Sequence, residues 1–455
     1  MGLPLTLSYE PGRIKGVVNV DLTPESVAQL GAVLGTILGE GTLVVMARDF
    51  YPPSRMLKRA FSSGLMSTGV TIMDFHGASL PELAFSIKRF GAKAGIHFTV
   101  SVAKEDTILI KLLDSLGTEM TIERTKEIIK LYETKHIVRT IPKRIGWISY
   151  AEYIHDIYTA AIIGMLDVDP IVSFEPKVVV DLNFSPASEV VPDLLSEIGV
   201  NAITLNSHKP PLRRGVRHLP STEGLNGLSN IVKTSDAHLG VALCADASRI
   251  VLIDDKGAIL TPDETIGLMM SFLPEGSKVV ISDTVTEAVD SIAEKKRIKL
   301  LRVRGVTGDV ARQARKVRAT LAATDKGEFI YPSFSLSPDG ILSLGRVVEQ
   351  ISLREKPLSE LRKDIPKLEK YELKVNVGEN SFTAILDYLS ASFTQVMAVV
   401  TGVKIIEGKN WAYVEPDFKE RTLKVSVEKP DKEKIELAKK VVEVVEGIIS
   451  EISKS

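Results

Sequence analysis

Hydrophobic and polar positions follow two periods in turn along the first part of the chain. "GTLVVMARD" (41–49) is a short apolar run bounded by Gly and charge, which predicts a buried strand. "SRMLKRAFSSGLMSTG" (54–69) follows with apolar residues spaced as on one helix face. The alternation continues through "VTIMDFHG", "LPELAFSIKRFGA" and "GIHFTVSV". Strands separated by helices of this length predict βαβ units and a parallel sheet.

The same strand–helix–strand pattern returns twice. Residues 176–206, "PKVVVDLNF" to "VNAITLN", show it once, and residues 277–305, "SKVVISDT" to "IKLLRVRG", show it again. Three α/β units of similar pattern are therefore expected, although no residue-level repeat links them.

The pattern changes after about Lys367. "YELKVNVG", "VVTGVKIIEG", "NWAYVEP" and "TLKVSVE" are typical of strands, and amphipathic helices are predicted at 383–395 and 431–450. A smaller α+β domain is expected there, with the charged stretch 354–370 as the linker before it. We predict an α/β protein of three consecutive sandwich-type domains with mixed sheets and a smaller α+β domain around a central cleft, divided as 1–150, 151–253, 254–366 and 367–455.

Composition and charge exclude several classes of protein. The chain has 455 residues, too many for one hydrophobic core, and a net charge of −1, so no basic surface indicates nucleic-acid binding. No apolar run reaches the roughly 18 residues that a membrane helix needs. Residues 1–16 lack a signal-peptide pattern, and the single cysteine fits a reducing cytoplasm. Abundant Lys, Glu, Ile and Val favour a thermophilic source.

Candidate chemistry lies where strands end. Ligands of parallel α/β sheets bind at the carboxyl ends of the strands. Ser101 stands at such an end, and so does the segment after "HLGVALCADASR" (238–249). These ends come from different predicted domains, so a site between domains is expected.

Several stretches resemble segments of the α-D-phosphohexomutases, the phosphoglucomutases and phosphomannomutases, and they occur in the same order along the chain as in that family. "IKGVVNVDLTPESVAQLGAVLGTIL" resembles the N-terminal stretch of that family, with Lys15 where the family has Arg. "ARDFYPPSRMLKRAFSSGLMSTGV" resembles its Gly-Arg-Asp-x-Arg-x-Ser-Ser segment. "VVVDLNF", "HLGVALCADASRIVLIDDKG", "PDGILSLGRVVE" and the C-terminal region follow. The resemblance covers nearly the whole chain.

The resemblance implies a phosphoserine that gives its phosphoryl group to a hexose phosphate and takes back the other phosphate of the bisphosphorylated sugar. It also implies a Mg²⁺ held by carboxylates, a polar loop that binds the sugar hydroxyls, and a cationic loop that binds the second phosphate. Each of these loops departs from the family pattern here.

The carrier and metal loops keep few of the family's residues. The family carrier loop is Thr-Ala-Ser-His-Asn-Pro, and here Ser101 is kept as the implied catalytic residue while His, Asn and Pro are lost. Lys111 matches a family lysine near the reacting oxygens. The family metal loop is Asp-Gly-Asp-x-Asp-Arg, and here Asp246 and Arg249 alone are kept. The implied Mg²⁺ site therefore has few ligands, Asp246 and Ser101. The alternatives are a strand-end serine and a bare turn around Asp246.

The remaining loops are similarly reduced. Lys15, Arg249, Glu328 and Asp309 are the implied substrate-binding residues, and Asp309 falls in a loop at 302–312. For Glu328 the alternative is a solvated side chain in a turn. The family phosphate loop is Arg-Pro-Ser-Gly-Thr-Glu-Pro, and here the acidic Glu415 and Asp417 stand in place of its Arg and Ser. Its implied phosphate ligands are Lys419, Arg421 and Lys424, and the alternative is a charged surface turn.

Three hypotheses follow. The first is a phosphohexomutase that acts on glucose or mannose phosphates through Ser101. The second is a weak or inactive relative that binds a sugar phosphate as a regulatory or partner protein. The third is an enzyme of altered chemistry in the same cleft. Because losing metal carboxylates costs transition-state stabilisation, we predict weak or absent mutase activity. One sequence does not specify the oligomeric state. Among the histidines, His97 is expected to pack in the core.

Overall fold

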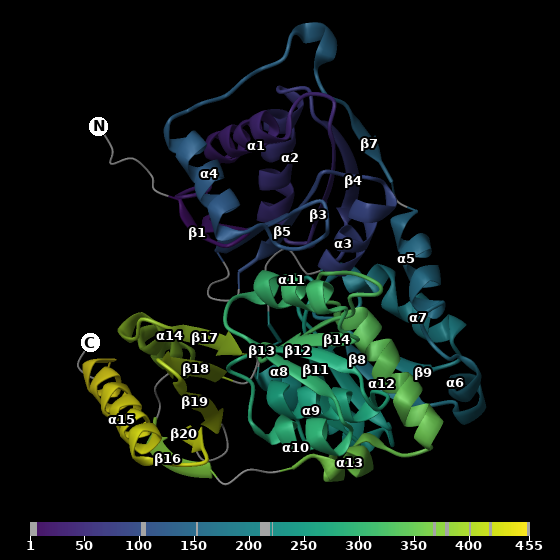
Figure 1. Ribbon diagram of the computed structural model, residues 1–455, viewed down its shortest axis with the longest axis vertical. Coiled ribbons are helices and arrows are strands. Elements are labelled where there is room, and N and C mark those ends of the chain that lie inside the picture. Colours follow the sequence, from purple (N-terminus) through teal and green to yellow (C-terminus); the bar gives the residue numbers. More distant parts are fainter. Residues whose placement is uncertain are drawn as a thin grey trace.

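A computed structural model describes residues 7–101, 106–151, 153–209, 219–220, 222–366, 370–377, 382–399, 402–417 and 421–452. The described residues form four sheets that follow one another along the chain (Figure 1). Each sheet lies within one of the expected segments, except that the last strand of the second sheet extends to Asp254. The α/β class with mixed sheets is confirmed, while the division into domains at the stated boundaries stays a prediction.

The first sheet has the strand order β1-β2-β6-β5-β3-β4-β7. Strands β3, β4, β5 and β7 run parallel, while β6 and β2 are antiparallel to their neighbours. The strands are β1 (Ser8–Glu10), β2 (Arg13–Val17), β3 (Leu43–Arg48), β4 (Thr71–Gly77), β5 (Ala94–Val100), β6 (Thr107–Leu113) and β7 (Ile148–Tyr150).

Helices cover both faces of this sheet, because successive residues of its strands alternate between two apolar cores. Val44 and Met46 point into the core beneath the first two helices, whereas Val45 and Ala47 point into the opposite core. The helices of this segment are α1 (Pro24–Leu38), α2 (Pro52–Met66), α3 (Leu80–Arg89) and α4 (Ile122–Glu133). Helices α1 and α2 touch so closely that a Cβ on Gly64 would lie 2.0 Å from the Ala28 carbonyl oxygen.

The second and third sheets share one large hydrophobic core. The second sheet has the order β11-β10-β8-β9 and the third the order β13-β12-β14-β15. Their strands are β8 (Lys177–Asp181), β9 (Asn201–Leu205), β10 (Leu239–Leu243), β11 (Ile250–Asp254), β12 (Lys278–Ser282), β13 (Lys299–Val303), β14 (Leu321–Thr324) and β15 (Glu328–Ile330). Their helices are α5 (Ile154–Ile163), α6 (Asp169–Phe174), α7 (Val191–Glu197), α8 (Thr222–Thr234), α9 (Pro262–Phe272), α10 (Ala288–Lys295), α11 (Thr307–Val317) and α12 (Gly340–Arg354).

The fourth sheet is antiparallel, with the order β16-β20-β19-β18-β17. Alternation separates its faces: Val425 and Val427 lie in the core beneath the C-terminal helix, while Ser426 belongs to the opposite face. The elements are β16 (Lys370–Asn376), α14 (Phe382–Ser392), β17 (Val396–Val399), β18 (Gly402–Glu407), β19 (Asn410–Asp417), β20 (Thr422–Glu428) and α15 (Lys432–Ile452).

Two expectations need correction. The charged stretch 354–370 is not a plain linker, because it contains α13 (Leu358–Leu361) and the short 3-10 helix Arg362–Asp364. Arg362 anchors that stretch through ion pairs with Asp254 at 2.9 Å and Glu264 at 2.8 Å. The segment 302–312 is not a loop throughout, since α11 begins within it at Thr307.

Within the described residues, no helix is both long enough and apolar enough to cross a membrane.

Candidate active site

Ser101 follows the last residue of β5, at the carboxyl end of a central strand. Its side chain is buried, and its amide donates to the Thr107 carbonyl at 2.7 Å. The strand end is also held by Asp49, whose Oδ2 accepts from the Val100 amide at 2.7 Å. The expected position of Ser101 at the carboxyl end of the strand is therefore confirmed. The residues that follow it, 102–105, lie outside the described residues.

Lys111 and Asp246 meet although they lie 135 positions apart. Lys111 belongs to β6, where its register partners are Arg13 on β2 and His97 on β5. Its Nζ donates to Asp246 Oδ2 at 2.5 Å, and the two side chains are 4% and 0% exposed. A charged pair thus joins the first sheet to the turn between β10 and β11, on the face of the sheet to which Ser101 belongs by alternation.

Asp246 organises that turn with its other carboxylate oxygen. Oδ1 accepts from the Ser248 hydroxyl at 2.6 Å, from the Ser248 amide at 3.1 Å and from the Cys244 thiol at 3.0 Å. Burial, with Asp246 nearby, raises the pKa of the Cys244 thiol to about 12. The interpretation of Asp246 as a turn residue between two strands is confirmed.

The described residues do not fit Mg²⁺ at this turn. Mg²⁺ prefers about six hard oxygen ligands in octahedral geometry. Asp246 is the one carboxylate of the turn, and both its oxygens already accept hydrogen bonds, one of them from a cationic lysine. No group of three or more His, Cys, Asp or Glu side chains able to hold a metal occurs among the residues described. The function proposed below therefore assigns no step to a metal ion.

His97 lies beside this ion pair and is fully buried, as expected of a core histidine. Its Nε2 lies 2.9 Å from the Ala78 carbonyl oxygen. Burial lowers the pKa of His97 to about 4 even though Asp246 lies close enough to oppose the shift. The imidazole is therefore neutral at pH 7.

Glu328 begins β15 and is buried, so it is not a solvated residue of a turn. Its Oε2 accepts from the hydroxyls of Thr307 at 2.7 Å and Thr324 at 2.8 Å, and its Oε1 lies 3.5 Å from Arg249 Nε. Burial alone would raise the pKa of Glu328, but Arg249, Lys326 and Arg13 outweigh it and hold that pKa well below its usual range. Glu328 is thus a permanent buried anion facing several cations.

Sequence reasoning missed part of this charge cluster. Arg13 binds Glu119 through Nε and Nη2, both at 2.8 Å. Burial lowers the pKa of Lys326, and the neighbouring Arg13 and Arg249 lower it further. The signal available in the sequence was the run "GRIKG", in which the charged Arg13 and Lys15 alternate with Ile14 and Gly16 as on a strand.

Two predicted substrate ligands lie apart from these contacts. Lys15 is 45% exposed and donates to Glu10 at 3.2 Å. Asp309 lies in the first turn of α11, where its oxygens accept from the Val306 amide at 3.1 Å and from Arg312 at 2.8 Å. The first contact caps the helix, the second is an ion pair three residues along it, and together they engage Asp309 within its own turn.

The phosphate-loop equivalent is divided between strands. Glu415 belongs to β19 and faces Lys424 of β20 in register. Burial raises the pKa of Glu415. The Arg421 guanidinium lies 5.5 Å from the centre of the Phe382 ring. Lys419 lies outside the described residues, so nothing tests its predicted role, and Arg421 and Lys424 remain predicted phosphate ligands.

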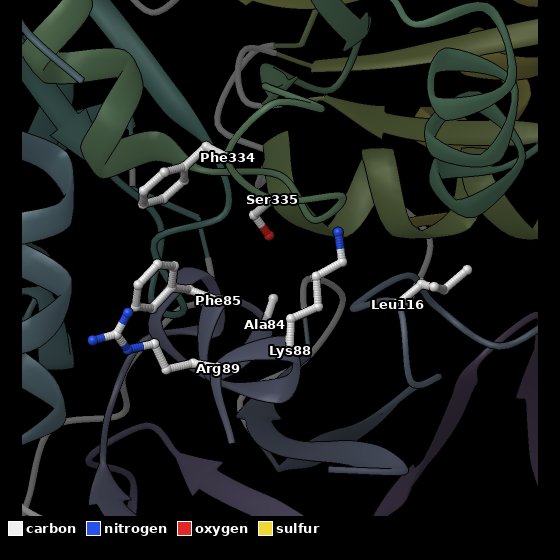
Figure 2. A pocket seen from close by; sticks show the side chains of 7 residues that line it. All are labelled: Ala84, Phe85, Lys88, Arg89, Leu116, Phe334 and Ser335. Carbon is white, nitrogen blue, oxygen red and sulfur yellow. The ribbon is translucent and has the colours of Figure 1, made fainter. Parts of the chain in front are cut away.

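A cavity of about 230 Å³ opens where α3 faces the segment after β15 (Figure 2). The Phe85 and Phe334 rings stack in its wall at 5.2 Å, and the Ser335 hydroxyl and the Lys88 ammonium point toward the same space. Leu116, which follows β6, also lines it. Because β6 is antiparallel to β5, this cavity lies at the amino end of β5, about 20 Å from Ser101 by strand length. It is not the Ser101 site.

Three consecutive family profiles match the chain: phosphoglucomutase/phosphomannomutase α/β/α domain I at residues 12–138, domain II at 151–257 and domain III at 261–368. A phosphoglucomutase/phosphomannomutase of Thermococcus kodakarensis is 30% identical over 432 residues, covering 92% of this chain and 94% of that protein. The chain belongs to the α-D-phosphohexomutase family.

Other members of the family extend the comparison. A probable phosphoglucosamine mutase of Pyrococcus furiosus is 30% identical over 436 residues, covering 93% of this chain and 94% of that one. These relatives fit the thermophilic source that the composition favours. A putative phosphomannomutase of Thermus thermophilus shares the fold with a TM-score of 0.75 at 17% identity, over 99% of each chain. An N-acetylphosphoglucosamine mutase of Aspergillus fumigatus, solved with GlcNAc-6P and magnesium, aligns with a TM-score of 0.54 at 11% identity, over 97% of this chain and 95% of that one.

Proposed function

We propose that this phosphohexomutase-family protein catalyses phosphoryl transfer on a hexose phosphate, with Ser101 as the carrier. The observation that carries the proposal is the buried contact of Lys111 with Asp246 on the Ser101 face of the first sheet. Hexose phosphate is the substrate class because mutases of glucose, mannose and glucosamine phosphates are the named relatives.

In the proposed step, a free hydroxyl of the hexose phosphate attacks the phosphoryl group carried on Ser101 Oγ. The new bond joins the sugar oxygen to phosphorus, the P–O bond to Ser101 breaks, and the proton of the sugar hydroxyl ends on the Ser101 oxygen. A hexose bisphosphate results, and its other phosphate then returns to Ser101 by the same exchange. No other reactant is consumed.

Lys111 is the residue proposed to stabilise charge on the moving phosphoryl oxygens. Its ammonium is already paired with Asp246, so it supplies less stabilisation than the family's divalent ion would. Slow turnover is therefore expected, as the sequence suggested. The loss of about 3–4 kcal/mol of charge stabilisation would lower kcat several-hundredfold.

Glu328 is proposed to orient the sugar. Its Oε2 is used by Thr307 and Thr324, whereas Oε1 has only the 3.5 Å ion pair with Arg249 among the contacts described. Oε1 is therefore the oxygen proposed to accept from a sugar hydroxyl, with Arg249 beside it as the proposed donor to a phosphate oxygen. We place this activity in the cytoplasm, which the single buried thiol and the metabolic relatives support.

A second candidate is a relative that binds the sugar phosphate without turning it over. The observation in its favour is that both oxygens of Asp246 are already bonded, which leaves no free carboxylate for a metal at the turn.

A coupled assay separates the two candidates. Conversion of glucose 1-phosphate, mannose 1-phosphate and glucosamine 1-phosphate to the 6-phosphates is followed with a hexose bisphosphate as activator. The Ser101→Ala variant is compared with Ser62→Ala, a matched buried serine on α2 outside the site. Turnover lost in Ser101→Ala and kept in Ser62→Ala supports the carrier role. Turnover absent from the parent, or equal in the two variants, refutes it.

A further inference from the structure

A second cavity, of about 330 Å³, lies between the fourth sheet and the first turns of α9 and α10. Figure 1 shows the sheet beside these two helices. Trp411 and Tyr413, at the start of β19, belong to its lining, whereas the phosphate-loop equivalent follows the other end of that strand. The cavity is therefore distinct from the Ser101 site and from the implied phosphate loop. Its volume is within the range of small-molecule sites, which often lie between domains.

Aromatic and aliphatic groups make up much of the wall. The Trp411 ring is fixed in place because the Lys404 ammonium lies 4.2 Å from its centre. Lys404 is itself buried and is held by Asp263 at 2.8 Å and by the Thr284 carbonyl at 3.1 Å. Ala288 and Val289, at the start of α10, also line the cavity. The cavity thus offers a preformed flat apolar surface.

Polar groups with unused bonding capacity surround that surface. Thr286 donates to Glu428 Oε2, and Glu428 Oε1 has no hydrogen-bond partner within the described residues. The Ser426 hydroxyl and the Lys370 ammonium also line the cavity, and neither has a partner there among the described side chains. The lining therefore offers both donors and acceptors beside the apolar surface, which suits a ligand whose hydroxyls both donate and accept.

The charges of the cavity select an uncharged ligand. Its lining carboxylates are Asp263, Glu264 and Glu428, and its lining cations are Arg362 and Lys370. Asp263 is paired with Lys404, and Glu264 with Arg362. Glu428 and Lys370, one anion and one cation, are the lining charges outside these pairs. A phosphate ester would meet the lining carboxylates, and a dication would meet the lining cations. Burial raises the pKa of Glu428, which favours its uncharged form and so further weakens the attraction of the cavity for a cation.

We propose that this cavity binds an uncharged monosaccharide, whose apolar ring face packs on Trp411 and Tyr413 while its hydroxyls bond to Ser426, Glu428 and Lys370. The bound sugar contacts the fourth sheet and the helices that face it, so it stabilises their mutual arrangement. The proposal does not depend on turnover at Ser101.

Tryptophan fluorescence tests the proposal directly. Trp147→Phe leaves Trp411 as the single tryptophan of the full chain. This protein is titrated with D-glucose, D-mannose and N-acetyl-D-glucosamine to about 50 mM, with sorbitol as a polyol control that has no ring. A saturable change in Trp411 emission with at least one sugar, and none with sorbitol, is expected.

Four further variants in the Trp147→Phe background locate the binding. Ser426→Val and Glu428→Gln are each expected to weaken the sugar about tenfold. Thr422→Val, a matched substitution on the same strand outside the cavity, and Ser101→Ala are expected to leave the affinity unchanged. Glu428→Gln carries the test if Ser426→Val does not fold by circular dichroism. The absence of saturation, an equal response to sorbitol, or equal affinity in Glu428→Gln and Thr422→Val overturns the proposal.

Discussion

The buried pair of Lys111 and Asp246 can be tested by replacing the lysine with methionine. Methionine keeps the length of the side chain and removes its charge. The Asp246 carboxylate would stay buried with 0% exposure and lose the ammonium now 2.5 Å away. Breaking a buried pair in this way costs about 3–5 kcal/mol, because the remaining charge is uncompensated. Since the pair joins the first sheet to the β10–β11 turn, both regions lose stability.

Thermal unfolding measures the loss. For a unit of 150–250 residues, each kcal/mol shifts Tm by roughly 2–4 °C, so Lys111→Met is expected to lower Tm by about 10 °C. Asp246→Asn removes the other charge while its side-chain oxygen can still accept from Ser248. The double variant is then expected to be less destabilised than the sum of the single variants by about 2 kcal/mol, because neither charge is left alone.

Lys58→Met is the matched control for activity. Lys58 of α2 forms a buried ion pair with Asp74 of β4, and neither residue belongs to the Asp246 turn. Both methionine variants should lose stability, but only Lys111→Met should abolish turnover at a temperature where both are folded. A Tm unchanged in Lys111→Met, additive effects in the double variant, or equal loss of turnover in Lys58→Met would refute the reasoning.

Three other outcomes are expected. Burial raises the pKa of Asp339 to about 6, above the roughly 3.9 of an unfolded chain. The free energy of unfolding that this group contributes is therefore fully present below pH 4 and is lost as the pH rises from 4 to 6. Asp339→Asn can keep the hydrogen bond from Tyr158 and cannot ionise, so its free energy of unfolding relative to the parent should rise by up to about 3 kcal/mol between pH 4 and 7. A difference in Tm that does not change with pH contradicts this. The Cys244 thiol, with its raised pKa and 1% exposure, should resist iodoacetamide at pH 8 until the chain unfolds, and rapid native labelling seen by mass spectrometry would contradict its burial. Glu328→Gln removes the counter-charge of the buried Arg249, so stability should fall by about 2 kcal/mol and KM for the hexose phosphate should rise, and an unchanged KM would exclude the proposed sugar contact.

The alternating elements were predictable because burial imposes a period. Residues 71–77 and 94–100 are strands near where short apolar runs placed them, and α3 lies between them at Leu80–Arg89. The capping box at Ser79 and Glu82 starts that helix at the expected residue. Ser101 could be placed near a strand end for the same reason, since charged residues begin at Lys104, shortly after it.

The contacts of the site were not predictable from local patterns. Glu328 stands in a short segment after Gly327, which is typical of an exposed turn, yet Thr307, Thr324 and Arg249 surround it. Those partners come from α11, β14 and the β10–β11 turn, so the burial depends on how three segments pack. Charged residues are rarely buried unless paired, and the pairing is a tertiary property.

Charge balance relates the changed turn to the proposed chemistry. The family turn brings three carboxylates, and a divalent cation together with a lysine would neutralise them. Here Cys244 and Ser248 stand in place of two of those carboxylates, and Asp246, the carboxylate that remains in the turn, pairs with Lys111. The loss of two carboxylates lowers the negative charge that an added cation would offset at this turn, and unpaired buried charge is what a low-dielectric interior penalises most. The same pairing means that a phosphoryl group arriving at Ser101 must compete with Asp246 for the Lys111 ammonium, and this competition is the physical reason that turnover should be slow.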